Sequence, residues 1–412
     1  MTILMLSEYF PPYDFGGSEW SVFYLAKGLE KMGYKTIILT PNYGNKKYKE
    51  KSRFKVITFP FYKKLKNNQL SPFWQTNSLW FIWTSICVLY FSIKTNVDVI
   101  HIQGKYFLPA AIITKFLTKK KVVTTLRDYI VLCPLGMCIL KSGNKCTLKE
   151  FLLEDIPMFL KIYKSKSNIF VKSLYAIAAI RGKIISQFLF FLLQFSDEVV
   201  LLSRTKKKVY EKLKISNLWI IPNSIELVHK VRKTRSNSLI YAGRFTPGKG
   251  VELLIPALKN LLKKDSTLKL YMYGNGFLKD KIRKEIKDYQ LTKNVILNKK
   301  IQHKMLINKI ASSKLVIIPS IWPEPYGRLA AESLAVGTPI VITTKVGAAD
   351  YIEKGKWGLI VKPAIQEIER AVDNALSQNK KLRSNILKDQ PKIKHIFIEQ
   401  TLKNYINVYK QI

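Results

Sequence analysis

The chain has 412 residues, too many to surround one hydrophobic core, so two domains of about 200 residues each are expected. Its 47% hydrophobic and 12% aromatic residues indicate a globular chain, and its four cysteines are too few for a secreted disulfide scaffold of this size. The 69 Lys and Arg against 28 Asp and Glu leave a net charge of +41, which attracts polyanions such as nucleic acid, anionic lipid headgroups or phosphorylated substrates.

Short apolar runs alternate with helical patterns along the whole chain. The first series of strand-like runs reads TILML, KTIILTP, KVITFP, DVIHIQ, KVVTTL, DEVVLLS and LWIIPN. A second series follows the basic stretch HKVRKTRSNS at 229–238 and reads LIYAG, LKLYMYG, NVILN, KLVIIPS, TPIVITT and GLIVK. Strands that alternate with helices predict parallel sheets with right-handed crossovers. We therefore expect an α/β fold of two doubly wound domains, split near 225–235, with the ligand cleft at the carboxyl ends of the strands.

The N-terminal stretch MTILMLSEYFPPYDFGG has no basic region before its apolar run, so we expect a first strand from residue 2, no signal peptide and a cytoplasmic protein. Gly16 and Gly17 stand where the next helix begins. Two glycines let the backbone approach a ligand closely, and a helix N-terminus favours phosphate. A tight turn without a ligand is the alternative.

Two segments point to a membrane surface. Phe73–Ile93 carries no charge, but polar residues interrupt it, so a buried or interfacial helix is favoured over a membrane span. The stretch 141–187 breaks the alternation and threads apolar runs among nine basic and three acidic residues. We expect basic amphipathic helices there, the composition of an anionic membrane surface. A solvated helical insertion is the alternative.

Cys133, Cys138 and Cys146 form a C-x4-C-x7-C pattern, and three thiols could bind Zn²⁺. A suitably spaced fourth Cys or His is missing nearby, so we expect unpaired structural cysteines and assign no metal. His101 falls inside a strand-like run and is expected to belong to the core.

The run IYAGRFTPGKG places two cations at the carboxyl end of a strand, beside the start of a helix. Arg244 and Lys249, five residues apart, could clamp a diphosphate there. A surface loop with solvated charges is the alternative. The run LYMYGNG ends another strand with Gly274 and Asn275, where a glycine turn brings backbone N–H groups to the cleft.

Two glutamates stand eight residues apart in PSIWPEPYGRLAAESLAVGTP. Pro325 disfavours helix at Glu324, so Glu324 is expected in a loop, with a helix from near Gly327 that carries Glu332. If all eight residues were helical, the two would be about 12 Å apart, too far for a paired-carboxylate dyad. The spacing suits two points along an extended ligand such as a nucleotide-sugar.

These motifs together resemble a GT-B glycosyltransferase of the large retaining family 4 type. EPYGRLAAE matches the family's E-x7-E motif, AGRFTPGKG its diphosphate site and IIPNSIE its I-P-N-G-I-D segment, while the Gly-Gly near residue 16, DVIHIQG, TLRDYIVLCP and KVGAADYI follow in the family's order. The resemblance covers nearly the whole chain and is more specific in the C-terminal half. It implies two facing Rossmann-like domains with a cleft between them.

The resemblance implies how a donor is held. Glu324 would contact the transferred sugar and Glu332 the ribose hydroxyls, while Arg244 and Lys249 would neutralise the leaving diphosphate. Families of this type bind without metal or cofactor. None of the eleven Asp residues stands in a D-x-D pair, the usual metal–diphosphate signature.

Further contacts are implied by position in the motifs. Ile301 falls where the family contacts the base, and Asn223 lies in the segment that matches I-P-N-G-I-D. Backbone N–H groups would cap the phosphates at four consecutive residues: Tyr326, Gly327, Arg328 and Leu329.

The acceptor side departs from the family. The family's histidine–aspartate pair after the fifth strand is here Arg127–Asp128. Arg127 would hold a phosphate or carboxylate, and Asp128 is a candidate for the catalytic base.

By this resemblance, residues 1–228 form an acceptor-binding domain with the insertion 141–187, residues 229–395 form a nucleotide-sugar domain, and 396–412 a helix that crosses back. The expected activity moves a sugar from a nucleotide-diphosphate sugar to a glycan or lipid-linked acceptor, in surface polysaccharide, glycolipid or glycoprotein glycan assembly. It would act at the inner face of the membrane, as a peripheral protein, and not on nucleic acid. The alternatives are a GT-B sugar-nucleotide epimerase and a non-enzymatic polyanion- or membrane-binding protein. Donor, acceptor, linkage and oligomeric state stay open.

Overall fold

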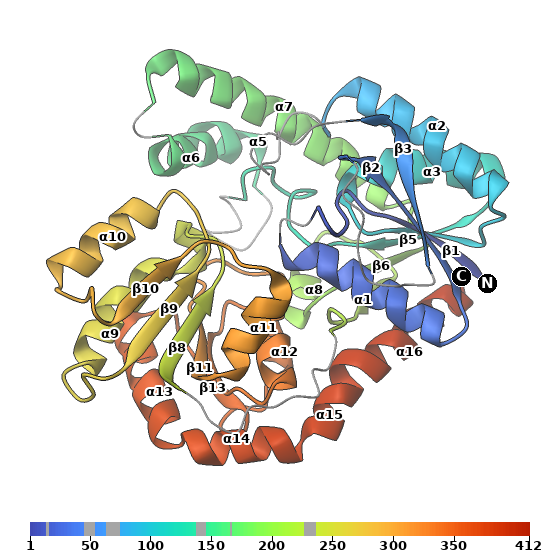
Figure 1. The fold of residues 1–412 in the computed structure, drawn as a ribbon. Coiled ribbons are helices and arrows are strands. Elements are labelled where there is room, and N and C mark those ends of the chain that lie inside the picture. The colour runs from blue at the N-terminus through green and yellow to red at the C-terminus, as the bar shows by residue number, and fades with distance from the viewer. Residues whose placement is uncertain (14–15, 45–53, 63–74, 137–145, 165–166, 226–235) are drawn as a thin grey trace. The chain divides into compact units, whose positions relative to one another are not determined.

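The computed structural model describes residues 1–13, 16–44, 54–62, 75–136, 146–164, 167–225 and 236–412. The chain divides into two compact units, described separately below (Figure 1). Unit 1 comprises Met1–Ile225 and Ile398–Ile412, and unit 2 comprises Glu226–Phe397. The functional domain ranges drawn from the sequence remain a prediction.

Unit 1 is built on a parallel sheet. Its described strands are β1 (Thr2–Leu6), β2 (Lys35–Asn42), β3 (Lys55–Tyr62), β4 (Val99–Ile102), β5 (Lys121–Thr125), β6 (Glu198–Leu201) and β7 (Leu218–Ile220). They lie in the order β3-β2-β1-β4-β5-β6-β7. The order reverses direction at β1, as expected of a doubly wound sheet, so the carboxyl ends of β1 and β4 mark the switch point where such folds bind ligands.

Helices cover both faces of this sheet (Figure 1). The described helical segments of unit 1 are α1 (Gly17–Lys31), α2 (Ser78–Lys94), η2 (Lys105–Phe107), α3 (Leu108–Thr118), α5 (Leu148–Glu150), η3 (Phe151–Asp155), α6 (Ile156–Tyr163), α7 (Ile169–Leu193), α8 (Arg204–Glu211) and α16 (Gln400–Gln411). Asn77, Asn168 and Ser203 cap α2, α7 and α8 by accepting a hydrogen bond from a first-turn N–H.

One core of unit 1 lies between the sheet and the pair α1 and α16. Alternate residues of β1, Ile3 and Met5, belong to it together with Leu402 and Tyr405 of α16, because successive side chains of a strand point to opposite faces. The expectation that His101 is a core residue is confirmed. It is fully buried, and its Nδ1 and Nε2 lie 2.6 Å from the Tyr409 hydroxyl and 2.8 Å from the Thr125 hydroxyl.

Unit 2 contains the second parallel sheet. Its described strands are β8 (Ser236–Ala242), β9 (Lys269–Tyr273), β10 (Val295–Asn298), β11 (Ser313–Ile318), β12 (Ile340–Thr343) and β13 (Gly358–Val361). Their order is β10-β9-β8-β11-β12-β13, again with a switch point, here between β8 and β11. The described helical segments are η4 (Pro247–Lys249), η5 (Val251–Leu253), α9 (Leu254–Leu261), α10 (Lys279–Asp288), α11 (His303–Ala311), α12 (Arg328–Ala335), η6 (Gly347–Tyr351), α13 (Ile365–Ser377), α14 (Asn379–Lys388), α15 (Gln390–Lys394) and η7 (His395–Glu399).

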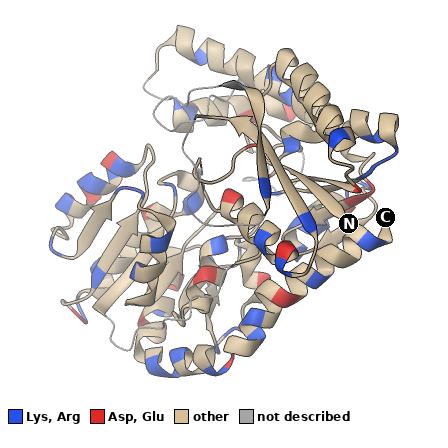
Figure 2. Cartoon of the chain, turned by 45° about the vertical axis from the view of Figure 1, so that its right-hand side comes forward, with Lys and Arg blue, Asp and Glu red and all other residues tan. Residues whose placement is uncertain are grey.

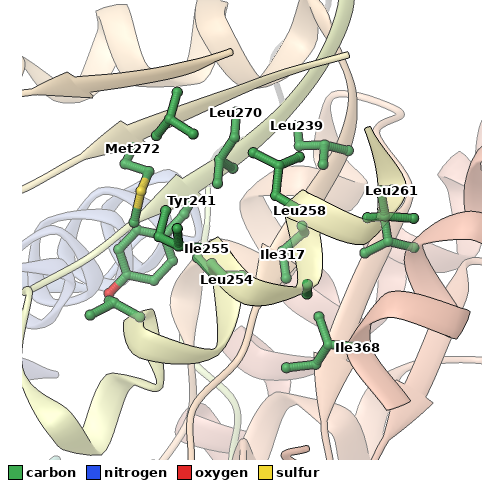
Figure 3. Packing of buried hydrophobic residues seen from close by; sticks show 14 of the residues in the cluster. Leu239, Tyr241, Leu254, Ile255, Leu258, Leu261, Leu270, Met272, Ile317 and Ile368 are labelled. Carbon is green, nitrogen blue, oxygen red and sulfur yellow. The ribbon is translucent and has the colours of Figure 1, made fainter. Parts of the chain in front are cut away.

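The core of unit 2 packs α9 and α13 onto the sheet. Figure 3 shows Leu254 and Leu258 of α9 against Leu270 of β9 and Ile317 of β11. Leu254 and Leu258 are four residues apart and therefore lie on one face of α9. All four side chains are nearly inaccessible to solvent. Burying an aliphatic side chain stabilises by about 1.5–3 kcal/mol, so this interface holds the strand ends of unit 2 in place.

Two apolar helices of unit 1 bear on the membrane expectations. The described part of the charge-free stretch 73–93 lies mainly in α2, a helix of 17 residues that is shorter than a candidate span, as expected for a buried or interfacial helix. By length and composition, one described helix could cross a membrane: α7, with 25 residues, in which a window of 18 residues has a mean hydropathy of 1.7. The insertion was expected to carry basic amphipathic helices as far as 187, but α7 continues to Leu193 and is mainly apolar.

Candidate active site

In unit 2 the loop after β8 is drawn tightly against the loop after β11. Gly250 has φ +65°, and a Cβ added there would lie 1.9 Å from the Pro319 carbonyl oxygen, so only glycine fits. The Gly248 carbonyl accepts hydrogen bonds from the N–H groups of Ile321 and Trp322, each at 3.1 Å. The two strand-end loops are thereby locked together.

This contact brings Lys249 to Glu324. Lys249 Nζ lies 2.5 Å from Glu324 Oε1, and the Ser320 hydroxyl donates to the other oxygen at 2.6 Å. Burial would raise the pKa of Glu324, but Lys249 together with Ser320 and Arg244 outweighs it, so this pKa lies below its ordinary value. Arg244 is exposed and contributes less to the same lowering. A fixed carboxylate and a cation therefore stand side by side at the end of β11.

Helix α12 begins directly after this loop, as the sequence predicts. Gly327 is its N-cap with φ +88°, and an added Cβ would lie 2.3 Å from Val346 Cγ1. The N–H of Ala348 donates to the Tyr326 carbonyl at 2.5 Å, which fixes the entry of the helix. The orphan amides of the first turn make this terminus favourable for an anion.

Glu332 lies on α12 with 6% of its surface exposed. Arg328 Nε is 2.5 Å and His303 Nε2 2.7 Å from the same oxygen, Oε1. Burial would raise the pKa of Glu332, but Arg328 and then His303 outweigh it and lower this pKa. Sequence reasoning missed His303 and Ser320; His303 stands 29 residues before Glu332, a separation that no local spacing rule reaches.

The other residues expected to contact the donor follow β9 and β10 or lie at the start of α12. An added Cβ at Gly274 would be 1.9 Å from the Gly243 carbonyl, and its own N–H donates to the Asn298 carbonyl at 3.2 Å, so the glycine serves the approach of two strand ends. Asn275 is exposed, while Ile301 and Leu329 are half-buried.

In unit 1 two carboxylates share one cation. Lys105 Nζ lies 2.7 Å from Asp128 Oδ2 and 3.5 Å from Glu8 Oε2. Burial raises the pKa of Glu8 above its ordinary value, against the opposing charge of Lys105. Burial acts the same way on Asp128, but Lys105 together with Lys206 and the Ile130 N–H outweighs it and lowers that pKa. The two carboxylates are thus held in different protonation environments.

Arg127 extends this cluster. Its Nη2 donates to Gln103 Oε1 at 2.5 Å, and its Nη1 donates to Asn223 Oδ1. The structure therefore joins Gln103, Arg127 and Asn223, which follow β4, β5 and β7. Arg127 and Asn223 were predicted from the sequence as substrate-binding residues. Glu8, Gln103 and Lys105 were not predicted, although each stands within three residues of the end of β1 or β4 and the carboxyl-end rule could have found them.

Lys206 on α8 contacts the backbone of the turn that carries Arg127 and Asp128. It is fully buried and donates to the backbone carbonyls of Asp128 at 2.7 Å and Leu126 at 2.9 Å. Burial lowers the pKa of Lys206 to about 7. The lysine holds the turn that presents Asp128.

The expected Gly-Gly site lies at the start of α1. Gly16 is the N-cap, and its N–H donates to the Glu19 carboxylate at 3.1 Å. That carboxylate stands where a phosphate was expected, while Gly17 begins the helix.

Two glycosyltransferase family models match this chain. The family model described as Glycosyltransferase Family 4 matches residues 15–229, just over half of the chain, and the model described as Glycosyl transferases group 1 matches residues 196–392. Anabaena HepE, solved with UDP and glucose, has TM-score 0.71 and 16% identity over 100% of both chains, which shows a common GT-B fold.

Two curated proteins show the extent of sequence similarity. The poly(ribitol-phosphate) alpha-N-acetylglucosaminyltransferase of Staphylococcus aureus is 26% identical over 51% of this chain and 43% of its own length. An uncharacterized 42.6 kDa protein in the cps region of Klebsiella pneumoniae is 22% identical over 90% of this chain and 92% of its own. The matches to the first four curated relatives span 36–55% of those proteins. With the fold, the family model and the motif geometry in agreement, the chain belongs to glycosyltransferase family 4.

Proposed function

We propose that this protein is a retaining glycosyltransferase that uses a nucleotide-diphosphate sugar. The observation that carries the proposal is the Lys249–Glu324 pair at 2.5 Å, beside the N-terminus of α12. A carboxylate held ionised accepts hydrogen bonds from sugar hydroxyls, and an ammonium neutralises a diphosphate. Glu332 would hold the ribose. The complexes of Anabaena HepE with UDP and UDP-glucose support this class of donor.

The transfer is a balanced substitution. The bond between the anomeric carbon and the diphosphate oxygen breaks, and the acceptor oxygen bonds to that carbon on the same face. The acceptor proton passes to the leaving diphosphate, or to Asp128 if that carboxylate is the base. Arg244, Lys249 and the first-turn amides of α12 stabilise the negative charge that develops on the leaving group.

We propose that this step needs no metal and no cofactor. In many transferases a divalent cation neutralises the diphosphate, whereas here the side chains of Arg244 and Lys249 and the N-terminus of α12 would take over that role. Measuring turnover after exhaustive chelation tests this directly: unchanged turnover supports the proposal, and a loss that Mg²⁺ or Mn²⁺ restores overturns it.

The activity is tested by thermal-shift screening of nucleotide-sugars, followed by mass spectrometry of products with and without acceptor. Product that contains both sugar and acceptor supports transfer. Conversion of the donor without acceptor would favour an epimerase instead. The Glu324→Ala variant separates the third candidate, a polyanion-binding protein suggested by the charge of +41, because that function would survive the substitution.

We further propose a lipid-linked acceptor at an anionic membrane, from the cytoplasmic side. Three helices of unit 1 expose apolar side chains, and α3 packs against both α2 and α7. On α7 the exposed set repeats at about the helical spacing and comprises Ile169, Phe170, Leu174, Ile177, Ile180, Ile184, Phe188 and Phe191. On α2 it comprises Leu79, Ile82, Ile86, Tyr90 and Ile93, and on α3 Ile113, Phe116 and Leu117. We call these residues the apolar face of unit 1.

The charge of these helices selects an anionic bilayer as the occupant. Helices α2, α3 and α7 contain no Asp or Glu, and their charged residues are all cations: Lys94, Lys115, Lys172 and Arg181, which are exposed or half-buried, and Lys183, which is buried and faces the interior. Figure 2, with Lys and Arg in blue and Asp and Glu in red, shows that blue positions predominate over the molecule. Apolar side chains with interspersed cations bind the interface of an anionic membrane.

The packing of α7 favours a helix that lies in the membrane–water interface over a helix that spans the membrane. Its opposite stripe is buried, and Lys183 donates to the Cys146 carbonyl at 3.1 Å while Ser186 donates to the Ile130 carbonyl at 2.5 Å. A spanning α7 would lose both contacts. The membrane therefore binds the exposed stripe.

Vesicle flotation tests this surface, with the Ile177→Glu and Phe188→Glu variants compared with Leu387→Glu on exposed α14 of unit 2. Each substitution on the apolar face should weaken binding to anionic vesicles about tenfold, and Leu387→Glu should not. Equal binding of all three, or extraction of the wild type only by detergent, overturns the interfacial assignment.

A further inference from the structure

Three buried side chains of unit 1 bring two sulfurs and a carboxylate together, at Cys133, Cys146 and Asp155. One ligand atom from each lies within 4.8 Å of the other two. The three side chains are 1%, 7% and 0% exposed. The sequence pattern had grouped Cys133 and Cys146 with Cys138, which lies outside the described residues. Asp155 was not weighed, because its place at the end of η3 becomes evident only in the fold.

Both sulfurs already accept hydrogen bonds from N–H donors. The Gly136 N–H lies 3.2 Å from Cys133 Sγ, in a turn where Gly136 has φ +68°. Lys183 Nζ lies 3.2 Å from Cys146 Sγ and 3.1 Å from the Cys146 carbonyl. Donors of this kind orient a sulfur and stabilise the thiolate, the form of cysteine that binds metals.

We propose that Cys133, Cys146 and Asp155 bind a thiophilic divalent cation, with Zn²⁺ as the first candidate. Around tetrahedral Zn²⁺, with bonds of about 2.3 Å to sulfur and about 2.0 Å to a carboxylate oxygen, a sulfur and an oxygen are about 3.5 Å apart. Cys133 Sγ and Asp155 Oδ2 are 4.0 Å apart, so this pair needs to close by about 0.5 Å. Two thiolates and a carboxylate select zinc or iron over magnesium or calcium.

The charges and protons balance at this site. Binding releases one proton from each thiol. Two thiolates and one carboxylate then face one divalent cation and the ammonium of Lys183, and the sum is zero. A neutral cluster removes the desolvation cost of leaving any one of these charges buried alone. Tetrahedral coordination also requires a fourth ligand, which these three residues do not supply.

The site would act as a structural staple and not in the transfer reaction. Cys133 follows Arg127 and Asp128 on the segment after β5, whereas Cys146 and Asp155 lie on the segment that leads into α6. A shared cation joins the two segments. The inference stands independently of the proposed transfer, because the cation contacts none of the donor-site residues.

Metal content tests the site in the full chain, purified without chelators or an immobilised-metal column. Elemental analysis should find about one zinc or iron per chain, the stoichiometry of one structural site. After removal of the metal, titration with Co²⁺ should produce a sulfur-to-metal charge-transfer band. The Cys133→Ser, Cys146→Ser and Asp155→Asn variants should each lower Co²⁺ affinity at least tenfold, whereas Cys87→Ser, which removes a buried thiol on α2, should not.

If the variants fail to fold, metal content and the Co²⁺ spectrum of the wild type still test the proposed site. Absence of bound metal together with absence of a charge-transfer band overturns the proposal. So does a Cys133–Cys146 disulfide found by mass spectrometry in protein kept under reducing conditions, because both sulfurs would then be unavailable. Metal retained equally by the three variants and by Cys87→Ser places the metal elsewhere and overturns the assignment as well.

Discussion

The two carboxylate clusters of this protein stand at equivalent places and are built differently. In unit 2 each glutamate has its own cation: Lys249 for Glu324 and Arg328 for Glu332. In unit 1 two carboxylates share Lys105. Separate cations lower both pKa values in unit 2, whereas in unit 1 the pKa of Glu8 is raised and that of Asp128 lowered.

This difference in carboxylate pKa values suits two different chemical roles. Two permanently ionised carboxylates suit the binding of hydroxyl groups, which a donor presents at its sugar and its ribose. A pair whose protonation environments diverge suits a place where a proton is held or moved. The comparison therefore predicts that unit 2 is sensitive to loss of a single partner and that unit 1 tolerates it.

The largest effect is expected when Lys249 is removed. Lys249→Ala leaves Glu324 without its ammonium and the leaving diphosphate without a cation, so turnover should fall about 10²–10³-fold. Lys264→Ala removes an exposed pair with Asp373 and should leave turnover unchanged. Steady-state rates of sugar transfer measure both. Equal rates for the two variants would contradict the role of Lys249.

Loss of Arg328 should cost stability. Arg328→Met leaves Glu332 buried with only His303 beside it, and the free energy of unfolding should fall by about 3 kcal/mol. Arg283→Met breaks an exposed pair with Asp280 and should cost less than about 0.5 kcal/mol. Denaturant unfolding measures both. A loss below about 1 kcal/mol for Arg328→Met would show that Glu332 does not depend on its own cation.

Lys206 offers a pH test in unit 1. Its pKa is about 7 in the folded chain and returns to its ordinary, higher value on unfolding, so the unfolded state binds the extra proton between these values. The free energy of unfolding should therefore rise with pH above 7, by about 2–3 kcal/mol up to pH 9. Lys206→Met should abolish this rise. Parallel pH profiles for variant and wild type would contradict the assignment.

The smallest effect is expected at the shared cluster. Asp128→Asn leaves Lys105 paired with Glu8, so with the diphosphate as proton acceptor transfer should fall only about tenfold, the equivalent of one charge-assisted hydrogen bond, whereas a loss of about 10²–10⁴-fold would assign the base role to Asp128. The double variant Glu8→Gln/Asp128→Asn should lose more than the product of the single losses, because Lys105 then has neither carboxylate. Transfer rates and nucleotide binding are measured together. Strictly additive losses would show that the two carboxylates do not share Lys105.

Local pattern was enough for much of the fold. The alternation of apolar runs predicted both parallel sheets, and the prolines and Gly327 placed Glu324 in a loop and the start of α12 at the next residue. These features depend on residues close in sequence, whose conformational preferences act before any distant contact forms. The types of the donor-site side chains followed from the same local motifs.

The partners of those side chains came only from tertiary packing. His303 reaches Glu332 across 29 residues, and Lys105 reaches Glu8 across 97. Asp155 joins two cysteines through the fold of an insertion that the sequence indicated only as basic and amphipathic. Such contacts are set by which strand ends become neighbours in the sheet, and that order is a property of the whole unit. The sequence by itself determined the elements and the chemical character of the donor loop, whereas the tertiary structure decided which charges are paired, because strand order and helix packing alone bring distant side chains within hydrogen-bond distance.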